Sequence, residues 1–321
     1  MAIPERLFQA LLAPVLALAI PCGQAGAASF DCAKAGTPLE KAICANPKLS
    51  ALDDELAGAY RAALTRLGEP GAAILRSGQR RWLKELGQRR GQSNGKFVDN
   101  DYQERIAELK DIPDYPRPEA PAPGPELRSA ALLPGFELTL RAAAPCTTGA
   151  EAPLAVPAQL LVRAKGQTAP LQAINLPGAR GLCGGSTLDD LATVADYNFD
   201  GLPDLSIGNE EETGYGGAGQ TMFLADPAGR GLVFNPGLTD LANTSNSFAA
   251  DPATKLIETM SKSGAFYHRT TLYRMAGDKP VIVSETIEDF SPVDGERVRK
   301  VTESKWVKGE WKTVVRVERP D

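Results

Sequence analysis

The most decisive stretch of this chain is a nine-residue segment, Asp196-Tyr197-Asn198-Phe199-Asp200-Gly201-Leu202-Pro203-Asp204. Side chains that carry oxygen recur at its positions 1, 3, 5 and 9, and a glycine stands at position 6. A hard cation such as Ca²⁺ takes about six to eight oxygen ligands, so one short loop can supply several of them only if it turns sharply. Gly201 permits such a turn because it has no Cβ that clashes at positive φ.

The segment therefore predicts a Ca²⁺ site with five ligands from the chain. These are the side chains of Asp196, Asn198, Asp200 and Asp204, and the main-chain carbonyl of Leu202. Position 12, which is Glu in an EF-hand, is Ile207 here, so the pattern is that of a shorter calcium loop of extracellular β-domains. The alternative is a polar turn between two strands that binds no metal.

Around this segment the sequence alternates apolar and polar residues with a period of two, which is typical of strands. Gly277-Asp278 and Lys308-Gly309 each separate two such runs and predict hairpins. We expect about eight to ten short strands in an all-β domain of sandwich or propeller-like type. The runs are Phe136–Leu140, Leu160–Val162, Thr221–Leu224, Leu232–Phe234, Leu256–Met260, Thr270–Met275, Val281–Ile287, Ser304–Val307 and Trp311–Val317.

The first residues of the chain are typical of an export signal, which we place at 1–28. Arg6 precedes an apolar run, Leu7–Ile20, and small residues follow at Ala25–Ala28. The run is too short and interrupted for a membrane span, and no later stretch could form one. We therefore expect a periplasmic protein. Secretion, or a lipid anchor on Cys22, is the less favoured alternative.

Four cysteines remain after the signal: Cys32, Cys44, Cys146 and Cys183. An even number in an oxidising compartment favours disulfides over a zinc site. Three pairings are possible, and proximity in the sequence favours Cys32–Cys44 with Cys146–Cys183.

Residues 29–110 have the periodicity of a small helical bundle. Thr37-Pro38-Leu39-Glu40 is a capping-box start, and Ser50 is expected to begin a second helix. Tyr60, Trp82 and Tyr102 fall on apolar faces and are expected in the core of the bundle. The proline-dense residues 111–128 predict a stiff extended linker, and the β domain is expected at 129–321. The predicted fold class is thus α+β multidomain, a disulfide-stapled helical bundle followed by an all-β domain.

The helical segment resembles a known family. Its spaced positions, Ser29-Phe30-Asp31-Cys32, Glu40 to Cys44, Leu52-Asp53, Tyr60, Gln79 with Trp82, and Tyr102 with Arg105-Ile106, are similar to those of the LprI-type domain, named for a mycobacterial lysozyme inhibitor. The family commonly has a second cysteine pair between the Trp and the last Tyr. Residues Gly87 to Asn100 contain no cysteine, so that second disulfide is absent here.

A second resemblance covers residues 190–300. The calcium segment, the following Tyr215-Gly216-Gly217, and Ser263-Gly264 with His268 are similar to periplasmic immunity and lysozyme-inhibitor-like proteins of bacterial type IV killing systems. Many of those relatives carry two cysteines before the histidine, whereas this chain has Ala265-Phe266-Tyr267. Such proteins would bind a peptidoglycan hydrolase as their partner.

No motif of a nucleophile, a metalloprotease, a phosphate loop or a dinucleotide site is present, so we expect no enzymatic activity. Residues 111–321 carry 20 Lys and Arg against 28 Asp and Glu, a net charge of −8, which argues against nucleic acid. We expect instead an inhibitor of lysozyme-type hydrolases. The alternative is an envelope module that binds glycan or protein and holds a structural calcium.

The expected inhibitory element is a protruding loop, Asn209–Gln220, with Tyr215 entering the catalytic cleft of the hydrolase. Calcium would hold the base of that loop and lower the free energy needed to order it. A second candidate is Ser263-Gly264-Ala265-Phe266-Tyr267, which fits an SGxxY pattern of another inhibitor class but also suits a strand end and turn. The oligomeric state stays open, with a homodimer among the assemblies considered. The expected target-contacting residues are Glu211, Glu212, Tyr215, Gly216, Gly217, Ser263 and Tyr267.

Overall fold

The computed structural model describes residues 28–93, 98–147, 152–213, 217–290, 292–293 and 296–319. They fall into two compact units, one ending at Asp54 and one beginning at Glu55. Within the described residues, no helix is long and apolar enough to cross a membrane. The expected export signal, 1–28, lies outside the described residues except for Ala28.

The first unit contains a 3₁₀ turn, η1 (Cys32–Lys34), the helix α1 (Pro38–Ala45) and the start of α2 (Pro47–Leu67). The capping box is confirmed, because Thr37 and Glu40 each bond the main-chain N–H of the other. The Cys32–Cys44 disulfide is also confirmed and joins η1 to α1. The expected start of the second helix at Ser50 is wrong. The helix α2 begins at Pro47 instead, because Asn46 caps it: Oδ1 of Asn46 accepts the N–H groups of residues 48 and 49.

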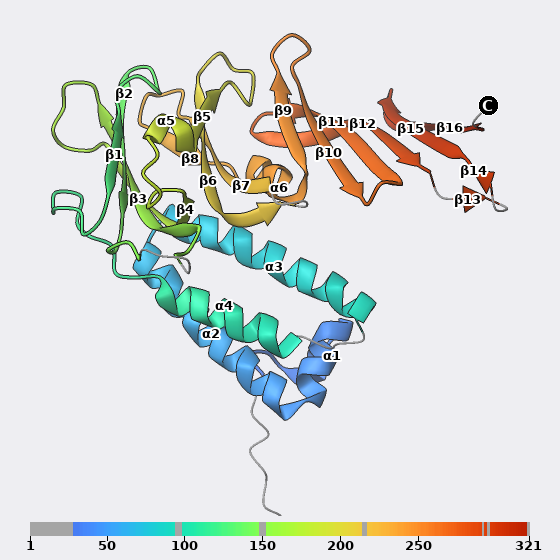
Figure 1. Ribbon diagram of the computed structural model, residues 1–321, viewed down its shortest axis with the longest axis horizontal. Coiled ribbons are helices and arrows are strands. Elements are labelled where there is room, and N and C mark those ends of the chain that lie inside the picture. The colour runs from blue at the N-terminus through green and yellow to red at the C-terminus, as the bar shows by residue number, and fades with distance from the viewer. Residues whose placement is uncertain are drawn as a thin grey trace, which may run out of the picture. The chain divides into compact units, whose positions relative to one another are not determined.

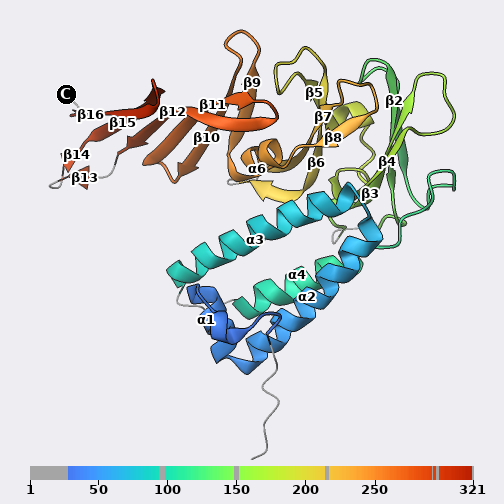
Figure 2. The ribbon, with the colours of Figure 1, turned by 180° about the vertical axis from the view of Figure 1, so that it is seen from behind.

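Two further helices, α3 (Gly71–Ser93) and α4 (Val98–Asp111), follow in the second unit. Trp82 and Tyr102 make an edge-to-face contact with ring centroids 5.5 Å apart, and Tyr102 is fully buried. Figure 2 shows α3 passing beside the strand β6 (Asp204–Thr213) and the short helix α6 (Pro236–Thr244). Helix α3 also packs against the strand β4 (Gln172–Arg180). The side of α3 that faces the sheets is therefore part of their core.

The rest of the chain forms antiparallel sheets in which, apart from β12 and β15, neighbouring strands are consecutive in the sequence, and the sheets appear one after another in Figure 1. This confirms the predicted fold class. The first sheet holds β1 (Glu126–Ser129), β2 (Phe136–Ala142), β3 (Ala155–Ala164) and β4 (Gln172–Arg180). The second follows the short helix α5 (Leu188–Leu191) and holds β5 (Ala192–Ala195), β6 (Asp204–Thr213), β7 (Gly217–Ala225) and β8 (Leu232–Phe234).

The third sheet has the order β16-β15-β12-β11-β10-β9. Its strands are β9 (Ser247–Asp251), β10 (Leu256–Ser263), β11 (Tyr267–Ala276), β12 (Lys279–Asp289), β15 (Arg299–Val307) and β16 (Glu310–Glu318), and the two-residue strands β13 (Pro292–Val293) and β14 (Glu296–Arg297) pair with each other. Both hairpins expected at Gly277-Asp278 and Lys308-Gly309 are confirmed. The expected eight to ten strands fall short of the 16 in the described residues, because strands such as β1 and β5 are too short to show alternation.

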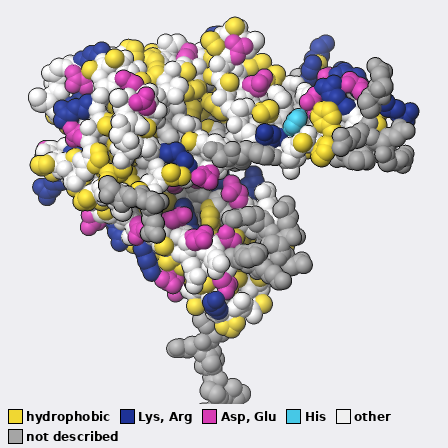
Figure 3. Space-filling view, viewed as in Figure 1, with side chains coloured by type: hydrophobic (Ala, Val, Ile, Leu, Met, Phe, Trp, Pro, Cys, Tyr) yellow, Lys and Arg dark blue, Asp and Glu magenta, His cyan; other side chains and the backbone are white. Residues whose placement is uncertain are grey.

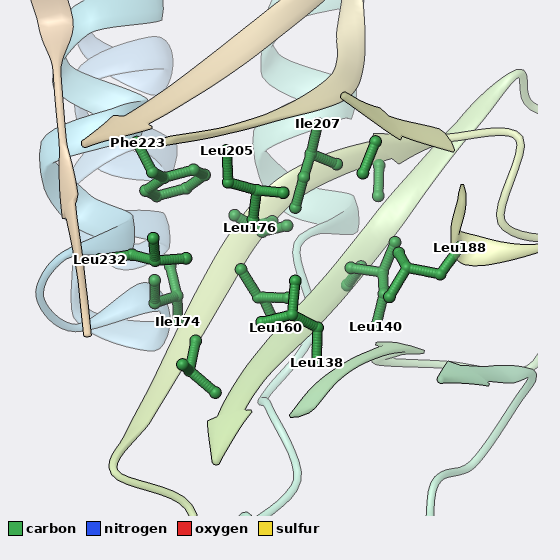
Figure 4. Close-up of a cluster of buried hydrophobic side chains, with 14 of the residues drawn as sticks. Leu138, Leu140, Leu160, Ile174, Leu176, Leu188, Leu205, Ile207, Phe223 and Leu232 are labelled. Carbon is green, nitrogen blue, oxygen red and sulfur yellow. The ribbon is translucent and has the colours of Figure 1, made fainter. Parts of the chain in front are cut away.

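The main core lies between the first two sheets (Figure 4). Alternate residues of each strand point into it, and register pairs such as Leu140 with Leu160 and Leu160 with Ile174 stack across the sheet. Leu205 and Phe223 enter from the second sheet and are fully buried. Each such side chain contributes about 1.5–3 kcal/mol by leaving water. The Cys146–Cys183 disulfide, also confirmed, lies at the edge of this core.

The proline-dense linker is bound to the first sheet along part of its length. Arg141 of β2 is only 2% exposed, and its guanidinium donates to the carbonyls of Arg117 at 2.8 Å and Ala120 at 2.7 Å. Gln159 of β3 donates to the carbonyl of Pro116 at 3.1 Å. Residues 112–125 lack helix and strand, and residues 126–128 belong to the edge strand β1. The segment lies against the sheet, because its carbonyls accept these buried donors.

Candidate functional site

The acidic segment expected to protrude as a loop is mostly strand. Residues 209–213 complete β6 and residues 217–220 begin β7, with Thr213 opposite Gly217 and Glu212 opposite Ala218. Tyr215 and Gly216 lie in the β6–β7 connection, residues 214–216, outside the described residues. The expectation of a loop over the whole of 209–220 is therefore wrong. The glycines and charged residues of this segment are compatible with the end of an antiparallel strand pair, because side chains from other elements bind the charged groups there.

Glu211 is held by a buried arginine of α3. Arg81 donates from Nε to Oε2 of Glu211 at 2.8 Å and from Nη2 to Oε1 at 2.5 Å, and its Nη1 donates to Asp240 of α6 at 2.5 Å. Ser77, one helical turn earlier, donates to the same Asp240 carboxylate at 3.1 Å. We call Arg81, Glu211, Asp240 and Ser77 the α3 clamp.

The Arg81 side chain is only 6% exposed, so its guanidinium is shielded from water, whereas the carboxylates of Glu211 and Asp240 are 25% and 51% exposed. Burial lowers the pKa of Arg81, but the hydrogen bonds and the charge of Glu211 raise it by more. A two-bond arginine–carboxylate pair fixes orientation as well as distance. The clamp therefore fixes the end of β6 next to the β6–β7 connection, and the carboxylate of Glu211 is engaged within the protein.

A bulge between Gly208 and Glu212 of β6 is supported by two buried asparagines. Asn209 accepts the N–H of Glu211 at 2.9 Å, and Asn243 of α6 accepts the N–H of Gln220 at 2.7 Å. Gly219 lies between them, and a Cβ there would stand 2.4 Å from Oδ1 of Asn209 and 2.5 Å from Oδ1 of Asn243. The glycine in this strand is thus required by the close approach of two side chains.

Glu210 points into a cavity of about 450 Å³ lined in part by Arg105 and Glu108 of α4 and by Arg180 at the end of β4. Burial, together with the negative charge of Glu211, raises the pKa of Glu210 from 4.5 to about 7. Glu212, also expected to contact a target, is 62% exposed and lies 3.6 Å from Arg180. Glu211 and Glu212 are the two glutamates expected to contact a target, and only Glu212 presents its side chain mainly to solvent.

The 196–204 loop is closed by its own polar groups. Asp196 accepts the N–H of Asp200 at 3.0 Å and of Gly201 at 2.8 Å, and Asp200 accepts the N–H of Leu202 at 2.8 Å. Phe199 and Gly201 both have positive φ, 62° and 90°, which tightens the turn as the sequence predicted for Gly201. The oxygens of positions 1, 3 and 5 therefore lie close together on an exposed surface, which suits a hard cation.

Asp204 is arranged differently from the other expected ligands. It is fully buried, and its two oxygens accept the N–H groups of Tyr197 and Ala225, each at 2.8 Å. Burial raises its pKa to about 6, although these hydrogen bonds act in the opposite direction. Among the described residues, no group of three or more His, Cys, Asp and Glu side chains is gathered as a metal site. The calcium site stays a prediction.

The 196–204 loop and the β6–β7 connection lie at opposite ends of β6. The strand begins at Asp204 and ends at Thr213, a span of roughly 30 Å at the usual rise per residue. A cation in the loop could thus affect the connection only through the strand. The α3 clamp lies next to the β6–β7 connection, whereas the 196–204 loop lies at the far end of the strand.

The second candidate pair, Ser263 and Tyr267, is brought together. The residues are directly opposite in the β10–β11 register, on either side of a turn in which Gly264 has a φ of 66°. The hydroxyl of Tyr267 accepts a hydrogen bond from Arg269 at 3.1 Å. This arrangement is the strand end and turn that the sequence also allowed, and a role in target binding stays a prediction.

The clamp residues Arg81 and Asp240 were missed by the sequence reasoning. Arg81 and Glu211 are 130 positions apart, and no local pattern links them. One usable signal is the spacing of Ser77 and Arg81, which places two polar groups on one face of α3.

Two comparisons with known proteins find a match for this chain. Residues 31–109 match the model of the family described as lysozyme inhibitor LprI, so the resemblance expected for this segment is confirmed. A comparison with curated proteins finds no match. A solved structure described as a Xanthomonas type IV secretion system related protein is similar at 22% identity and a TM-score of 0.47, over 59% of this chain and 92% of that chain.

Proposed function

We propose that this protein is an exported, non-catalytic inhibitor of lysozyme-type peptidoglycan hydrolases. The observation that carries the proposal is the match of residues 31–109 to the lysozyme inhibitor LprI family. The leader-like first 28 residues and the two disulfides suit the periplasm, which is oxidising. The partner is then a hydrolase with a concave, sugar-binding active site.

We further propose that the β6–β7 connection enters this active site through Tyr215. A tyrosine brings a large contact area, few rotatable bonds and a hydroxyl that can bond a catalytic carboxylate. The α3 clamp supports this proposal, because Arg81 and Glu211 hold the preceding strand in one position. A rigid support lowers the conformational entropy lost on binding, so more of the contact free energy is available for affinity.

Calcium belongs to the proposal as a stabiliser of the second sheet. Asp196, Asn198 and Asp200 supply hard oxygen donors on one tight exposed loop, and each carboxylate can accept more than the N–H bonds it already has. Leu202 would add its carbonyl. To coordinate the ion, Asp204 would have to give up one of its two main-chain N–H partners. Otherwise it would act on the ion from outside the coordination shell.

The proposal is tested by measuring the rate at which lysozymes clear a peptidoglycan suspension. We expect micromolar protein to slow clearance by at least one susceptible lysozyme-type enzyme. Tyr215→Ala should weaken inhibition about 10-fold or more, as expected for an interface anchor worth more than 1.4 kcal/mol. Tyr267→Ala is the matched control, since it truncates a tyrosine on the other candidate hairpin.

Two outcomes would count against this view. Unchanged clearance with every lysozyme, and with any muramidase encoded beside the gene, would refute inhibition. Equal potency of Tyr215→Ala and the parent, with a loss in Tyr267→Ala, would move the contact to the Ser263–Tyr267 hairpin.

A second candidate function is glycan binding, which a cavity of about 270 Å³ near the β6–β7 connection favours. Its lining contains no charged residue among those described, and includes the hydroxyls of Ser206 and Thr213 and the rings of Tyr197 and Phe248. Neutral hydrogen-bonding groups beside aromatic rings suit a sugar, which has hydroxyls on an otherwise apolar ring. Titration calorimetry with peptidoglycan fragments, and with Phe248→Ala as the variant, distinguishes this function from hydrolase inhibition.

A further inference from the structure

The outer strands of the third sheet expose large apolar side chains. Every residue of β16 is exposed. Trp311, Val315 and Val317 are 45%, 53% and 60% exposed, and Trp306 of β15 is 47% exposed. Figure 3 shows hydrophobic side chains at the surface of this part of the sheet, next to Lys, Arg, Asp and Glu side chains. Contiguous exposed apolar groups of this size mark an interaction surface.

These apolar residues share one face of the β15–β16 pair. Trp306 is opposite Trp311 in the register, Thr302 is opposite Val315, and side chains alternate between faces along each strand. The two tryptophan rings are in edge contact, with centroids 5.6 Å apart. The residues form a stripe that runs along the last strand.

The strand β16 is also an open edge. It is the last strand in the sheet order and pairs only with β15 among the described strands. The two-residue turn Lys308-Gly309 makes Val307 and Glu310 a hydrogen-bonded pair, so alternate residues from Glu310 on are bonded to β15. The N–H and C=O groups of Trp311, Thr313, Val315 and Val317 therefore point away from β15.

Two features that block pairing at an edge, a bulge and a proline, are missing from β16. The register of β15 and β16 is continuous over nine pairs, without a bulge, and β16 contains no proline. The basic residues Lys312 and Arg316 lie on the face opposite Trp311 and Val315. The edge is long, regular and apolar on one face, which suits pairing with another strand.

We propose that β16 pairs antiparallel with β16 of a second copy of this chain, giving a two-fold dimer with one continuous sheet. An antiparallel pair of identical strands is self-complementary, and a two-fold axis normal to the sheet keeps the apolar stripes of both copies on one side. This inference goes beyond the proposed inhibition and does not depend on it.

Charge selects the register of this dimer. With Thr313 opposite Thr313 of the second copy, Glu310 is opposite Arg316 at both ends, and Trp311 is opposite Val315 on the apolar face. With Val314 opposite itself, Glu310 would be opposite Glu318 and Lys312 opposite Arg316, which places like charges together. With Val315 opposite itself, Trp311 would be opposite Arg319 and lose its apolar partner. The first register is the one we assign.

A cysteine at the two-fold axis tests the dimer and its register together. In the full chain with Cys22→Ser, Thr313→Cys should form a disulfide between copies under mild oxidation, because opposite residues in a hydrogen-bonded pair have Cα atoms about 5.5 Å apart. Val315→Cys is the matched register control and should cross-link at least 10-fold more slowly. Equal cross-linking of the two variants, or faster cross-linking of Val315→Cys, overturns the register.

Sedimentation velocity on the parent protein tests the association itself. We expect a concentration-dependent shift from the monomer mass to twice that mass. Val315→Lys at the edge should weaken dimerisation at least 10-fold, whereas Ile282→Lys, an exposed position on β12 of the same sheet, should leave it unchanged. A parent that stays monomeric up to about 100 μM, where even weak specific interfaces associate, overturns the proposal and leaves the edge to a strand from another protein.

Discussion

Replacing Arg81 with methionine would remove the α3 clamp while keeping an unbranched side chain in α3. Arg81 makes three hydrogen bonds to two carboxylates. A hydrogen bond to a charged group contributes about 1.5–3 kcal/mol, and breaking a buried ion pair costs about 3–5 kcal/mol. Glu211 is 25% exposed and Asp240 is 51% exposed, so water would solvate both once they are freed. We therefore expect a loss of about 3 kcal/mol, at the lower end of this range.

The assay is thermal unfolding followed by a double-mutant cycle. A loss of about 3 kcal/mol corresponds to a fall in Tm of about 6–12 °C for a unit of this size. Arg80→Met is the control, because it removes the same charge from an exposed neighbour on α3. Combining Arg81→Met with Glu211→Gln should give a coupling energy of about 2 kcal/mol.

One result would refute this reasoning. If Arg81→Met and Arg80→Met lower the Tm by the same small amount, and the cycle shows coupling below about 0.5 kcal/mol, the clamp does not stabilise the fold. The inhibition assay adds a second readout. A weaker inhibitor with an unchanged Tm would mean that Arg81 acts on the target and not on β6.

Three further predictions concern the two ends of β6 and the neighbouring strand β7. Calcium at 100 times its Kd should raise stability by about 2.7 kcal/mol in calorimetry, and Asp200→Ala should abolish the increase; an unchanged Tm with and without EDTA would exclude the ion. Because the pKa of Glu210 is raised from 4.5 to about 7, the folded state holds an extra proton between these values, so the stabilisation is present below pH 4.5 and lost as the pH rises through 7. Although Glu210 lines a cavity, the residue as a whole is exposed to solvent, so burial acts on it less strongly than on an enclosed group and the change is on the order of 1 kcal/mol. Glu210→Gln should flatten that part of the pH profile of the unfolding free energy. Gly219→Ala should destabilise by about 1–3 kcal/mol in urea unfolding, because its Cβ would overlap the amide oxygens of Asn209 and Asn243; a neutral result would mean that both side chains can move aside.

The features that were predictable from sequence are local ones. The capping box at Thr37 and Glu40 and the hairpins at Gly277 and Lys308 each depend on residues within one short segment. Cysteine spacing also sufficed for both disulfides, since each pair closes a modest loop. In these cases the chemistry that fixes the backbone is written in neighbouring positions.

The features that could not be predicted depend on distant partners. Glu210 to Glu212 have the charge expected of a solvated loop, yet Arg81 and Arg180 supply the cations that let this run continue as strand. The bulge depends on Asn243, which arrives from α6. A single sequence contains no signal that pairs these positions, so their effect emerges only when the elements pack.

The buried Arg141 has a consequence for how the gene could be divided and recombined. A fragment beginning at residue 129 would keep Arg141 and its acceptor Gln159 but lose the carbonyls of Arg117 and Ala120, leaving the cation with only part of its acceptors. Tyr115 extends this dependence, since its hydroxyl donates to the carbonyl of Leu176 in β4. A crossover that exchanges the N-terminal part for another must therefore fall before Tyr115, and the bond from Arg81 to Glu211 moves that limit to a point before α3. The proline-dense segment is inherited with the strands that follow it.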